Sequence, residues 1–347
     1  MGKKVLHILP SNDLAGAENV AISMISHMSD PFECAYASPE GGIKEILMDR
    51  GIRHIPLHQF TSSQIRKVVK EWKPDIIHAH DFKATIKSLF SFTSIPVISH
   101  IHQNPIWLHR LNLRSVLFFA ACLKLDQVIV VSPVIKERTL LAYAFKSKTM
   151  AISNVVDREW IKQKAAFPAD DCYDMAFIGR FEDVKDPLRF IQIVSEVKQQ
   201  MPDLKVIMMG GGTLADECRK VIQAKGMQQT IELKGFMDNP YPLLNTSKVL
   251  VLTSKSEGLP MVVMEAMTLG KPVVVPRLTG MDTIVEESCG CICETDAEFI
   301  QNLITLLQSE ETYARMSQAA LKKAELVCNM EFYIEQVKKV YHDAISN

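Results

Sequence analysis

Apolar residues occur along the chain in short uninterrupted runs that alternate with longer amphipathic stretches. The strand-like segments built around these runs lie at 4–9, 33–38, 53–57, 75–78, 97–100 and 128–131 in the first half. Those in the second half lie at 175–179, 205–209, 231–234, 249–252 and 272–276. Helical periodicity between or after them is clearest at 18–28, 187–199, 214–225, 261–269 and 331–345. Apolar strands that alternate with helices are typical of buried parallel sheets, so the pattern predicts an α/β protein with doubly wound sheets.

The alternation stops between Ile152 and about Asp174, where the segment Pro168–Asp171 is typical of an interdomain connection. A chain of 347 residues also exceeds the size that one hydrophobic core usually fills. We therefore predict two doubly wound domains, at residues 1–165 and 172–329, followed by a C-terminal helix within 330–347.

Composition narrows the class of protein. Hydrophobic residues make up 47% of the chain and charged residues 23%, which excludes intrinsic disorder and fits a globular enzyme. The net charge of −1 hides an asymmetry, because residues 1–150 carry 18 basic and 12 acidic side chains whereas residues 151–347 carry 21 and 28. A basic first half fits contact with anionic lipid head groups or a phosphate-bearing acceptor, and it equally fits a chance fluctuation.

The sequence carries no recognisable signal for export. Only Val5–Leu9 separates the first lysines from Pro10, which is too short for the apolar core of a signal peptide. Charged residues interrupt the most apolar later stretch, Ser115–Val131, so it does not read as a membrane span. Eight scattered cysteines indicate free thiols in a reducing compartment. We expect a cytoplasmic protein, with peripheral contact at the inner face of the cell membrane as a further expectation.

The segment Lys248–Pro272 carries the densest group of candidate functional residues. Its apolar strand ends in a polar, glycine-containing turn, and Pro260 is typical of the first turn of the helix that follows. Such a junction exposes backbone N–H groups to an anion. Glu257 lies in the turn and Glu265 in an otherwise apolar helix, where a carboxylate needs polar partners such as the hydroxyl groups of a ligand.

Glu257-Gly258-Leu259-Pro260, with Glu265 eight positions after the first glutamate, resembles the E-x7-E motif of retaining GT-B glycosyltransferases, specifically glycosyltransferase family 4. The resemblance implies that Glu257 approaches the donor sugar and that Glu265 binds the nucleotide ribose. It assigns contacts with the sugar and phosphates to the intervening backbone, here Gly258, Leu259, Pro260 and Met261. Taken alone, the motif fits equally well a surface glutamate and a helix that only packs on a sheet.

The same resemblance implies the GT-B fold, in which two Rossmann-like domains face each other across a cleft. Residues 1–165 would then form the acceptor domain and residues 172–329 the donor domain. The final helix, within 330–347, would pack back on the N-terminal domain.

A second motif supports the first. Gly179-Arg180-Phe181 followed by Lys185 resembles the family's G-R-x4-K signature, in which both cations stabilise the departing nucleotide diphosphate. The alternative is that Arg180 and Lys185 are solvated side chains that only balance the charge of the nearby acidic residues. By resemblance, Gly210 and Gly212 line the nucleotide side, and Gly235 and Phe236 lie where the base is held.

Two features of the first half also match the family. Ala15-Gly16-Ala17-Glu18 resembles its G-G-x-E loop, although Ala15 replaces the first glycine, so only Gly16 is carried over; a plain helix N-terminus is the alternative. His102 matches a histidine that lies near the donor sugar and the acceptor, where it would bind a hydroxyl or assist the nucleophile. A core histidine is the alternative for this residue.

Histidines also raise the question of a metal. His78, His80, His100 and His102 end two predicted strands at alternate positions, so a four-histidine metal site is conceivable. No carboxylate spacing typical of a metal enzyme accompanies them, and the resemblance implies catalysis without a metal, so we expect none. A G-x-G-x-x-G fingerprint is also missing, which disfavours an oxidoreductase.

Together these residues predict a retaining, metal-independent glycosyltransferase that needs no cofactor. Its donor would be a nucleoside-diphosphate sugar, UDP- or GDP-linked, and its acceptor a glycan or glycolipid, with a lipid-linked bacterial polysaccharide or lipopolysaccharide intermediate preferred. No nucleic-acid partner is expected.

The stretch 104–125 mixes aromatic, apolar and basic residues, which fits a membrane-surface element or an ordinary half-buried helix. A sugar-nucleotide epimerase of GT-B-like fold and a non-catalytic sugar-nucleotide-binding protein remain as alternatives.

Overall fold

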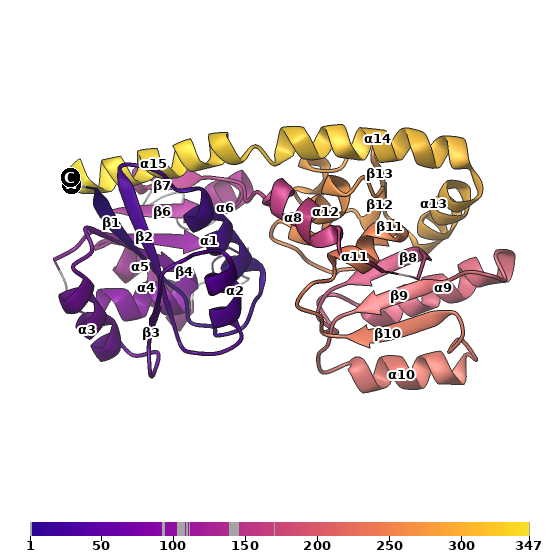
Figure 1. Ribbon diagram of the computed structural model, residues 1–347, viewed down its shortest axis with the longest axis horizontal. Helices are drawn as coiled ribbons and strands as arrows, with labels where there is room; N and C mark the ends of the chain where they lie inside the picture. The colour runs from indigo at the N-terminus through magenta and orange to yellow at the C-terminus, as the bar shows by residue number, and fades with distance from the viewer. Residues whose placement is uncertain are drawn as a thin grey trace. The chain divides into compact units, whose positions relative to one another are not determined.

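The computed structural model describes residues 2–91, 94–102, 108, 110, 112–138, 146–169 and 171–346. The chain divides into two compact units, one made of Met1–Val155 and Met330–Asn347 and the other of Val156–Asn329. In each unit, helices cover both faces of a parallel sheet (Figure 1). Among the described residues, no helix combines the length and the apolar composition that a membrane span needs.

The first unit contains a seven-stranded sheet with the order β3-β2-β1-β4-β5-β6-β7, in which all neighbouring strands are parallel. Its strands are β1 (Lys3–Ile8), β2 (Phe32–Ser38), β3 (His54–Pro56), β4 (Ile76–His80), β5 (Val97–Ile101), β6 (Gln127–Val130) and β7 (Thr149–Ala151). Its helices are α1 (Gly16–His27), α2 (Ile43–Asp49), α3 (Ser62–Trp72), α4 (Asp81–Leu89), α5 (Leu113–Cys122), α6 (Pro133–Arg138), the 3₁₀ turn η2 (Lys146–Lys148) and α15 (Met330–Ser346).

The second unit contains a six-stranded parallel sheet with the order β10-β9-β8-β11-β12-β13. Its strands are β8 (Tyr173–Ile178), β9 (Val206–Met209), β10 (Ile231–Gly235), β11 (Ser247–Val251), β12 (Val273–Pro276) and β13 (Gly290–Cys293). Its helices are α8 (Arg158–Ala165), α9 (Pro187–Gln200), α10 (Ala215–Ala224), α11 (Tyr241–Asn245), α12 (Met261–Thr268), the 3₁₀ turn η3 (Met281–Thr283), α13 (Asp296–Gln308) and α14 (Glu310–Val327).

Strand order fixes where each sheet can bind a ligand. In the first sheet the chain winds outward from β1 to β3, then crosses back to β4 and winds outward to the other edge. In the second sheet the same reversal occurs between β8 and β11. Ligands of doubly wound sheets bind outside the carboxyl ends of the strands at this switch point. Residues that follow β1, β4, β8 and β11 therefore lie where such a sheet binds its ligand.

The strands are apolar on both faces because helices cover both sides of each sheet. In β11, Val249 and Val251 belong to the hydrophobic core on one face and Leu250 to the core on the other. This burial explains why the strands read as continuous apolar runs rather than as alternating ones.

The hydrophobic pattern did not predict three elements, β7, β13 and α8. Strand β7 has only three residues and lies at the sheet edge. Helix α8 is mostly polar, since only Ile161 and Ala165 are buried in it, and it lies in the predicted connection. It packs on α11 and α12, so residues 156–165, which we assigned to the first domain, cluster with the second unit.

Candidate active site

Two loops at the switch point of the second sheet hold each other in place. One follows β8 and carries Lys185, and the other follows β11 and carries Glu257. The backbone N–H of Lys255 donates to the carbonyl of Val184 at 2.9 Å. The hydroxyl of Thr253 donates to the carbonyl of Lys185 at 3.2 Å. The backbone around both charged side chains is thus fixed by hydrogen bonds between the loops.

Lys185 and Glu257 form an ion pair in this position. The distance from Lys185 Nζ to Glu257 Oε1 is 2.6 Å, and the two side chains are only 18% and 11% exposed. A neighbouring pair, Lys255 with Asp183, has the same 2.6 Å separation but is 50% and 86% exposed. Water screens the second pair far more than the first, so the first pair is the one whose charges act strongly on a bound group.

Gly210 and Gly212 let the loop after β9 pack against the backbone after β8. Gly210 has φ of +144°, and a Cβ there would lie 1.9 Å from the carbonyl oxygen of Gly179. Gly212 has φ of +150°, and its Cβ would lie 2.6 Å from the carbonyl oxygen of Phe181. Both positions therefore require glycine for internal packing alone. Gly211, between them, has open space on its side.

Arg180, Gly235 and Phe236 lie at the same carboxyl edge of this sheet. Arg180 follows Gly179 and is exposed, with no ion pair among the described residues. Gly235 has φ of +73°, and its carbonyl accepts a 2.7 Å hydrogen bond from the Gly210 N–H. Phe236 is 66% exposed. The structure thus brings the three predicted loops to one edge but shows no contact between Arg180 and Lys185.

Glu265 lies in α12 and is 8% exposed. Burial raises the pKa of its carboxyl to about 7, while a hydrogen bond with the Tyr241 side chain opposes that shift. Helix α12 follows Pro260 without a side-chain cap, so its first N–H groups are not covered by a capping residue. Gly258, Leu259 and Met261 are half-buried beside that helix start. A buried carboxylate and an uncapped helix start therefore lie on the same element.

Three side chains near this edge escaped the sequence analysis. Tyr241, at the start of α11, is the partner of Glu265. Glu182 accepts hydrogen bonds from the Thr213 backbone and hydroxyl at 3.3 and 3.0 Å, which ties two loops together. Ser254 is buried, and its hydroxyl has no partner in the part of the chain that the structure describes. Only Ser254 carried a signal in the sequence, its place in the polar turn after β11.

In the first unit, Gly16 is the first residue of α1, which follows the switch-point strand β1. A Cβ at Gly16 would meet nothing within 4 Å, so the protein itself does not require glycine there. Glu18, two residues later, is buried, and burial raises its pKa to about 7. Asp81 and Asp13 add to that shift by like-charge repulsion.

His102 follows β5 and is 6% exposed. Its backbone N–H donates to Asp81 Oδ1 at 3.0 Å, and its Nε2 lies 2.8 Å from Nδ1 of His80. Burial lowers the pKa of His102, and Asp81 opposes that shift. The structure gathers His78, His80, His100 and His102 and adds His7 from β1, which the sequence analysis did not include. Its only sequence signal was its place in the first apolar run.

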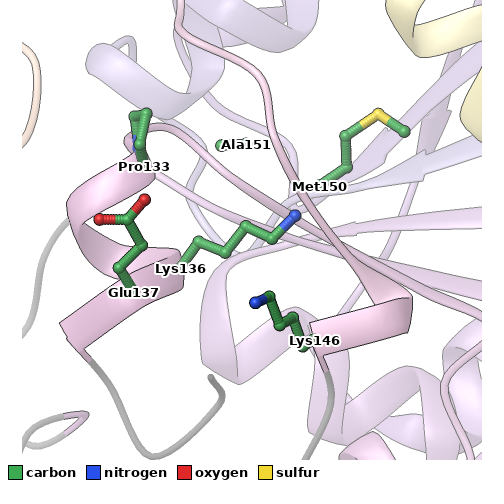
Figure 2. Close-up of a pocket in the computed structure, with 6 residues that line it drawn as sticks. All are labelled: Pro133, Lys136, Glu137, Lys146, Met150 and Ala151. Atoms are coloured by element: carbon green, nitrogen blue, oxygen red, sulfur yellow. The ribbon is translucent and has the colours of Figure 1, made fainter. Parts of the chain in front are cut away.

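A separate pocket of about 540 Å³ lies at the carboxyl ends of β6 and β7. Figure 2 shows Lys136 reaching across it toward Met150. It is lined by Pro133, Lys136, Glu137, Lys146, Met150 and Ala151, none of which the sequence analysis selected.

Two family models match the chain in succession. The model described as Glycosyltransferase Family 4 matches residues 16–160, and the model described as Glycosyl transferases group 1 matches residues 157–323. Together they span most of both units.

Curated relatives of the chain are also named as glycosyltransferases. An uncharacterized glycosyltransferase of Methanocaldococcus jannaschii is 27% identical over 233 residues, which cover 61% of this chain and 57% of the relative. The UDP-Gal:alpha-D-GlcNAc-diphosphoundecaprenol alpha-1,3-galactosyltransferase of Escherichia coli is 22% identical over 380 aligned residues, 99% of this chain and 98% of the relative. The chain thus spans little more than half of the first relative and nearly all of the second.

Solved structures share the fold. HepE of Anabaena, in complex with UDP-glucose, superposes with a TM-score of 0.84 at 18% identity, covering 98% of this chain and 99% of HepE. Sucrose-phosphate synthase from Thermosynechococcus elongatus gives 0.76 at 15% identity and 99% coverage of both chains. At such low identity the likeness concerns the fold, which is the pair of Rossmann-like α/β domains called GT-B.

Proposed function

Because the chain belongs to the GT-B glycosyltransferases of the family 4 type, we propose that it moves a sugar from a nucleoside-diphosphate sugar to a glycan or glycolipid acceptor with retention of configuration. One observation carries this proposal. Lys185 and Glu257, 72 residues apart in the chain, form a half-buried 2.6 Å ion pair at the switch point of the second sheet. A bound donor would give each partner of the ion pair a new contact, because its diphosphate attracts Lys185 and its sugar hydroxyls donate to Glu257.

The leaving group of this reaction is a nucleoside diphosphate whose negative charge grows as the glycosidic bond breaks. Lys185 and the exposed Arg180 supply positive charge at the carboxyl edge of the sheet. The uncapped start of α12 supplies the backbone N–H groups of Met261 and Val262, whereas that of Val263 already donates to the carbonyl of Pro260. Once a donor is bound, such groups stabilise the developing charge without further reorganisation. We propose on this basis that neither a metal ion nor a cofactor is needed for the transfer.

Glu265 is suited to hold the ribose. It is 8% exposed, and two ribose hydroxyls could donate to it as water does to an exposed carboxylate. Tyr241 already provides one polar partner. Gly210, Gly212, Gly235 and the exposed ring of Phe236 would line the nucleotide side. A UDP- or GDP-linked donor fits this arrangement, and the UDP-glucose complex of HepE supports the UDP form.

In the first unit, Gly16 and His102 are proposed to serve the reacting sugars. Open space beside Gly16 allows the backbone to approach a ligand closely. His102 keeps an Nδ1 without a partner among the described residues, so it can bind a sugar hydroxyl or assist the nucleophile.

The proposed acceptor is a lipid-linked intermediate of a bacterial surface polysaccharide or lipopolysaccharide. The name of the Escherichia coli relative, which acts on a diphosphoundecaprenol-linked sugar, supports this choice. A second support is the α5 surface, which we define as the exposed residues Arg110, Leu113, Arg114, Val116, Leu117, Leu123 and Lys124. Its apolar members follow helical spacing and its charges are all positive, a combination that favours peripheral contact with an anionic membrane at the inner face.

The direct test is release of nucleoside diphosphate from UDP- and GDP-linked sugars, with and without a membrane extract as the source of acceptor. We expect release to depend on the extract and the radiolabelled sugar to enter the lipid fraction. An epimerase would convert the donor without the extract. A protein that only binds sugar nucleotides would release no diphosphate under either condition. Glu257→Ala should abolish release, and Lys255→Ala, which alters the exposed pair nearby, should not.

A further inference from the structure

The first unit holds a buried cluster of rings that the proposed function uses only at one point. Five histidines and one tyrosine form it: His7, His78, His80, His100, His102 and Tyr341. His102 is 6% exposed and the other five are fully buried. Strand register explains the gathering, because His7 pairs with His78 across β1 and β4, and His80 pairs with His100 across β4 and β5. Helix α15 contributes the tyrosine.

The rings form two rows that are joined by hydrogen bonds. In one row, His7 Nδ1 lies 3.1 Å from His80 Nε2, and His80 Nδ1 lies 2.8 Å from His102 Nε2. In the other row, Tyr341 Oη lies 2.8 Å from His78 Nδ1, and His78 Nε2 lies 3.3 Å from His100 Nδ1. Bonded histidine rings have centroids 5.0 to 5.3 Å apart, and their planes are inclined to each other by 9° to 26°.

The two rows stack, and among the described residues hydrogen bonds connect them at one end. His78 lies over His80 with centroids 4.5 Å apart, and His100 lies over His102 at 4.0 Å. Tyr341 Oη also lies 3.3 Å from His7 Nε2, which joins the rows. The order of the resulting histidine–tyrosine chain is His102, His80, His7, Tyr341, His78, His100. Its two ends, His102 Nδ1 and His100 Nε2, are buried without a partner in the part of the chain that the structure describes.

Counting protons shows what these ends can bind. Burial lowers the pKa of all five histidines and raises that of Tyr341, so each ring carries one proton that it can donate. Six groups thus hold six protons, and the five hydrogen bonds between them use five. One proton remains, and it must lie at one end of the chain. The ends are then one donor and one acceptor.

This rule links the tautomers of all five rings. If His100 carries the remaining proton, every histidine is the Nε2–H tautomer. If His102 carries it, every histidine is the Nδ1–H tautomer. A mixed state arises only if Tyr341 donates to Met24 Sδ, 3.5 Å away, and accepts from both rows. A thioether is a weak acceptor compared with an imidazole nitrogen, so the two uniform states are favoured.

We propose that His100 and His102 together bind a single hydroxyl group, and that Tyr341 is the positioning residue that keeps their two open nitrogens complementary. A hydroxyl accepts from one end and donates to the other, so it satisfies both buried groups at once. The inference rests on the proposed function only for the source of that hydroxyl, which is either a sugar substrate or a buried water molecule.

The same count disfavours a metal ion at this cluster. Two sets, His7 with His78 and His80, and His80 with His100 and His102, place one ring nitrogen each within 4.8 Å of one another. A cation needs bare nitrogens, yet both nitrogens of His7, His78 and His80 are already in hydrogen bonds. Only the mixed state, with the proton of Tyr341 on Met24, would leave both ends bare.

Nitrogen-15 NMR of the histidine rings in the full chain, with any affinity tag removed, tests the proposal. In the wild-type protein we expect the five buried rings to share one tautomer. In Tyr341→Phe, the nitrogens of His7 and His78 that face the phenyl ring lose their partner, so the row that carries a proton at that position shifts its protons toward its other end. His7, His80 and His102 should become Nδ1–H, while His78 and His100 become Nε2–H. Whichever uniform state the wild type adopts, one row changes.

Tyr333→Phe is the matched control. Tyr333 is a buried tyrosine of the same helix, and its hydroxyl has no partner in the described part of the chain. It should leave all five tautomers unchanged. A wild type with three Nε2–H and two Nδ1–H rings, or a Tyr341→Phe variant with the wild-type pattern, would overturn the proposal. So would binding of one Zn²⁺ per chain that His100→Ala abolishes.

The source of the hydroxyl is found by adding UDP-glucose, UDP-N-acetylglucosamine or GDP-mannose, each compared with its free nucleoside diphosphate. A shift of the His100 and His102 end nitrogens with a nucleotide sugar but not with the nucleotide assigns the hydroxyl to the sugar. Uniform tautomers without such a shift assign it to water. Where transfer is measurable, Tyr341→Phe should lower kcat/KM about tenfold, the effect of one hydrogen bond, and Tyr333→Phe should stay within about twofold.

Discussion

The two units share a doubly wound scaffold, but the side chains at their switch points differ in charge. In the second unit, the loops after β8 and β11 bring Lys185 and Glu257 together as an ion pair. In the first unit, the strands at the switch point are filled with neutral imidazoles, and burial holds their pKa values below 6.5. We therefore propose that the fixed charges of the second unit serve a phosphate group and that the buried, neutral imidazoles of the first serve hydroxyl groups. The difference between the units lies in the loops and strand ends, because the sheets themselves are alike.

The largest predicted effect is a loss of stability of the first unit in acid. A histidine of the unfolded chain takes up a proton near pH 6.5, whereas burial lowers the pKa of His7 to about 3. Burial also lowers the pKa of His78, His80, His100 and His102. Below pH 6.5 the unfolded state therefore binds more protons, and the free energy of unfolding falls by about 1.4 kcal/mol per pH unit for each histidine. The pKa of Glu18 is raised to about 7, so the folded state takes up a proton there before the unfolded state does. This offsets the destabilising effect of about one histidine.

The second unit should respond in the opposite direction. Residues 156–329 contain no histidine. Burial raises the pKa of Glu265 from 4.5 to about 7, so the folded state binds the additional proton between these values and gains stability as the pH falls. Hydrogen exchange of peptides from β4 and β5, compared with peptides from β8 and β11, measures both units in one sample from about pH 7.5 to about pH 5.5. Parallel loss of protection in both units would contradict the comparison.

The next effect concerns the charged pair of the second unit. Lys185→Ala should lower the transfer rate by about 10²–10³-fold, because it removes a fixed cation from the developing charge of the leaving group. Lys255→Ala removes a cation of the neighbouring exposed pair and should change the rate by no more than about twofold. Steady-state release of nucleoside diphosphate measures both variants. An equal loss of transfer rate in both variants would mean that the rate depends on positive charge in general and not on the half-buried position of Lys185.

Glycines at the carboxyl edge provide a third test. Gly210→Ala places a Cβ 1.9 Å from the carbonyl oxygen of Gly179 and keeps φ at +144°, so the loop that carries Arg180 must move. We expect a loss of about 3 kcal/mol in the free energy of unfolding of the second unit. Gly211→Ala is the control, because nothing lies within 4 Å of its Cβ. Urea unfolding of both variants decides the matter, and similar midpoints would show that the two loops are not packed as described.

The smallest predicted effect is on membrane contact through the α5 surface. Arg114→Glu should weaken binding to vesicles that contain phosphatidylglycerol by about five- to tenfold, since one basic residue near an anionic surface contributes about 1 kcal/mol. Leu117→Ser should weaken it as well. Leu326→Ser, in α14 of the second unit and 77% exposed, is the control for loss of an exposed leucine. Sedimentation with vesicles measures all three variants, and equal binding to phosphatidylcholine vesicles would contradict an electrostatic contribution.

Much of the fold followed from the hydrophobic pattern, because strands buried on both faces are continuous apolar runs. The family and the fold class that Glu257, Glu265, Arg180 and Lys185 suggested are confirmed by the matching models and structures. The roles assigned to these and the other site residues stay predictions. What the pattern could not give was α8, whose few buried residues make it look like a connection.

The histidine cluster shows a second limit. Alternate spacing of His78 with His80, and of His100 with His102, was visible in the sequence and raised the idea of a metal site. The placement of His7 depends on the pairing of β1 with β4, and that of Tyr341 on the packing of α15 against the first unit. Neither long-range contact has a local signal, so the sequence left a metal site conceivable, although none was expected, and could not show that the rings are hydrogen-bonded to one another.

The central claim is that the Lys185–Glu257 pair separates to receive a nucleotide sugar. Calorimetric titration of the full chain with UDP- and GDP-linked sugars tests it most directly. The account predicts one donor bound per chain, an affinity that falls with salt, and a loss of at least about tenfold in Lys185→Ala with none in Lys255→Ala. Donor binding that is equally strong in Lys185→Ala, or no binding of any nucleotide sugar by the wild type, would contradict it.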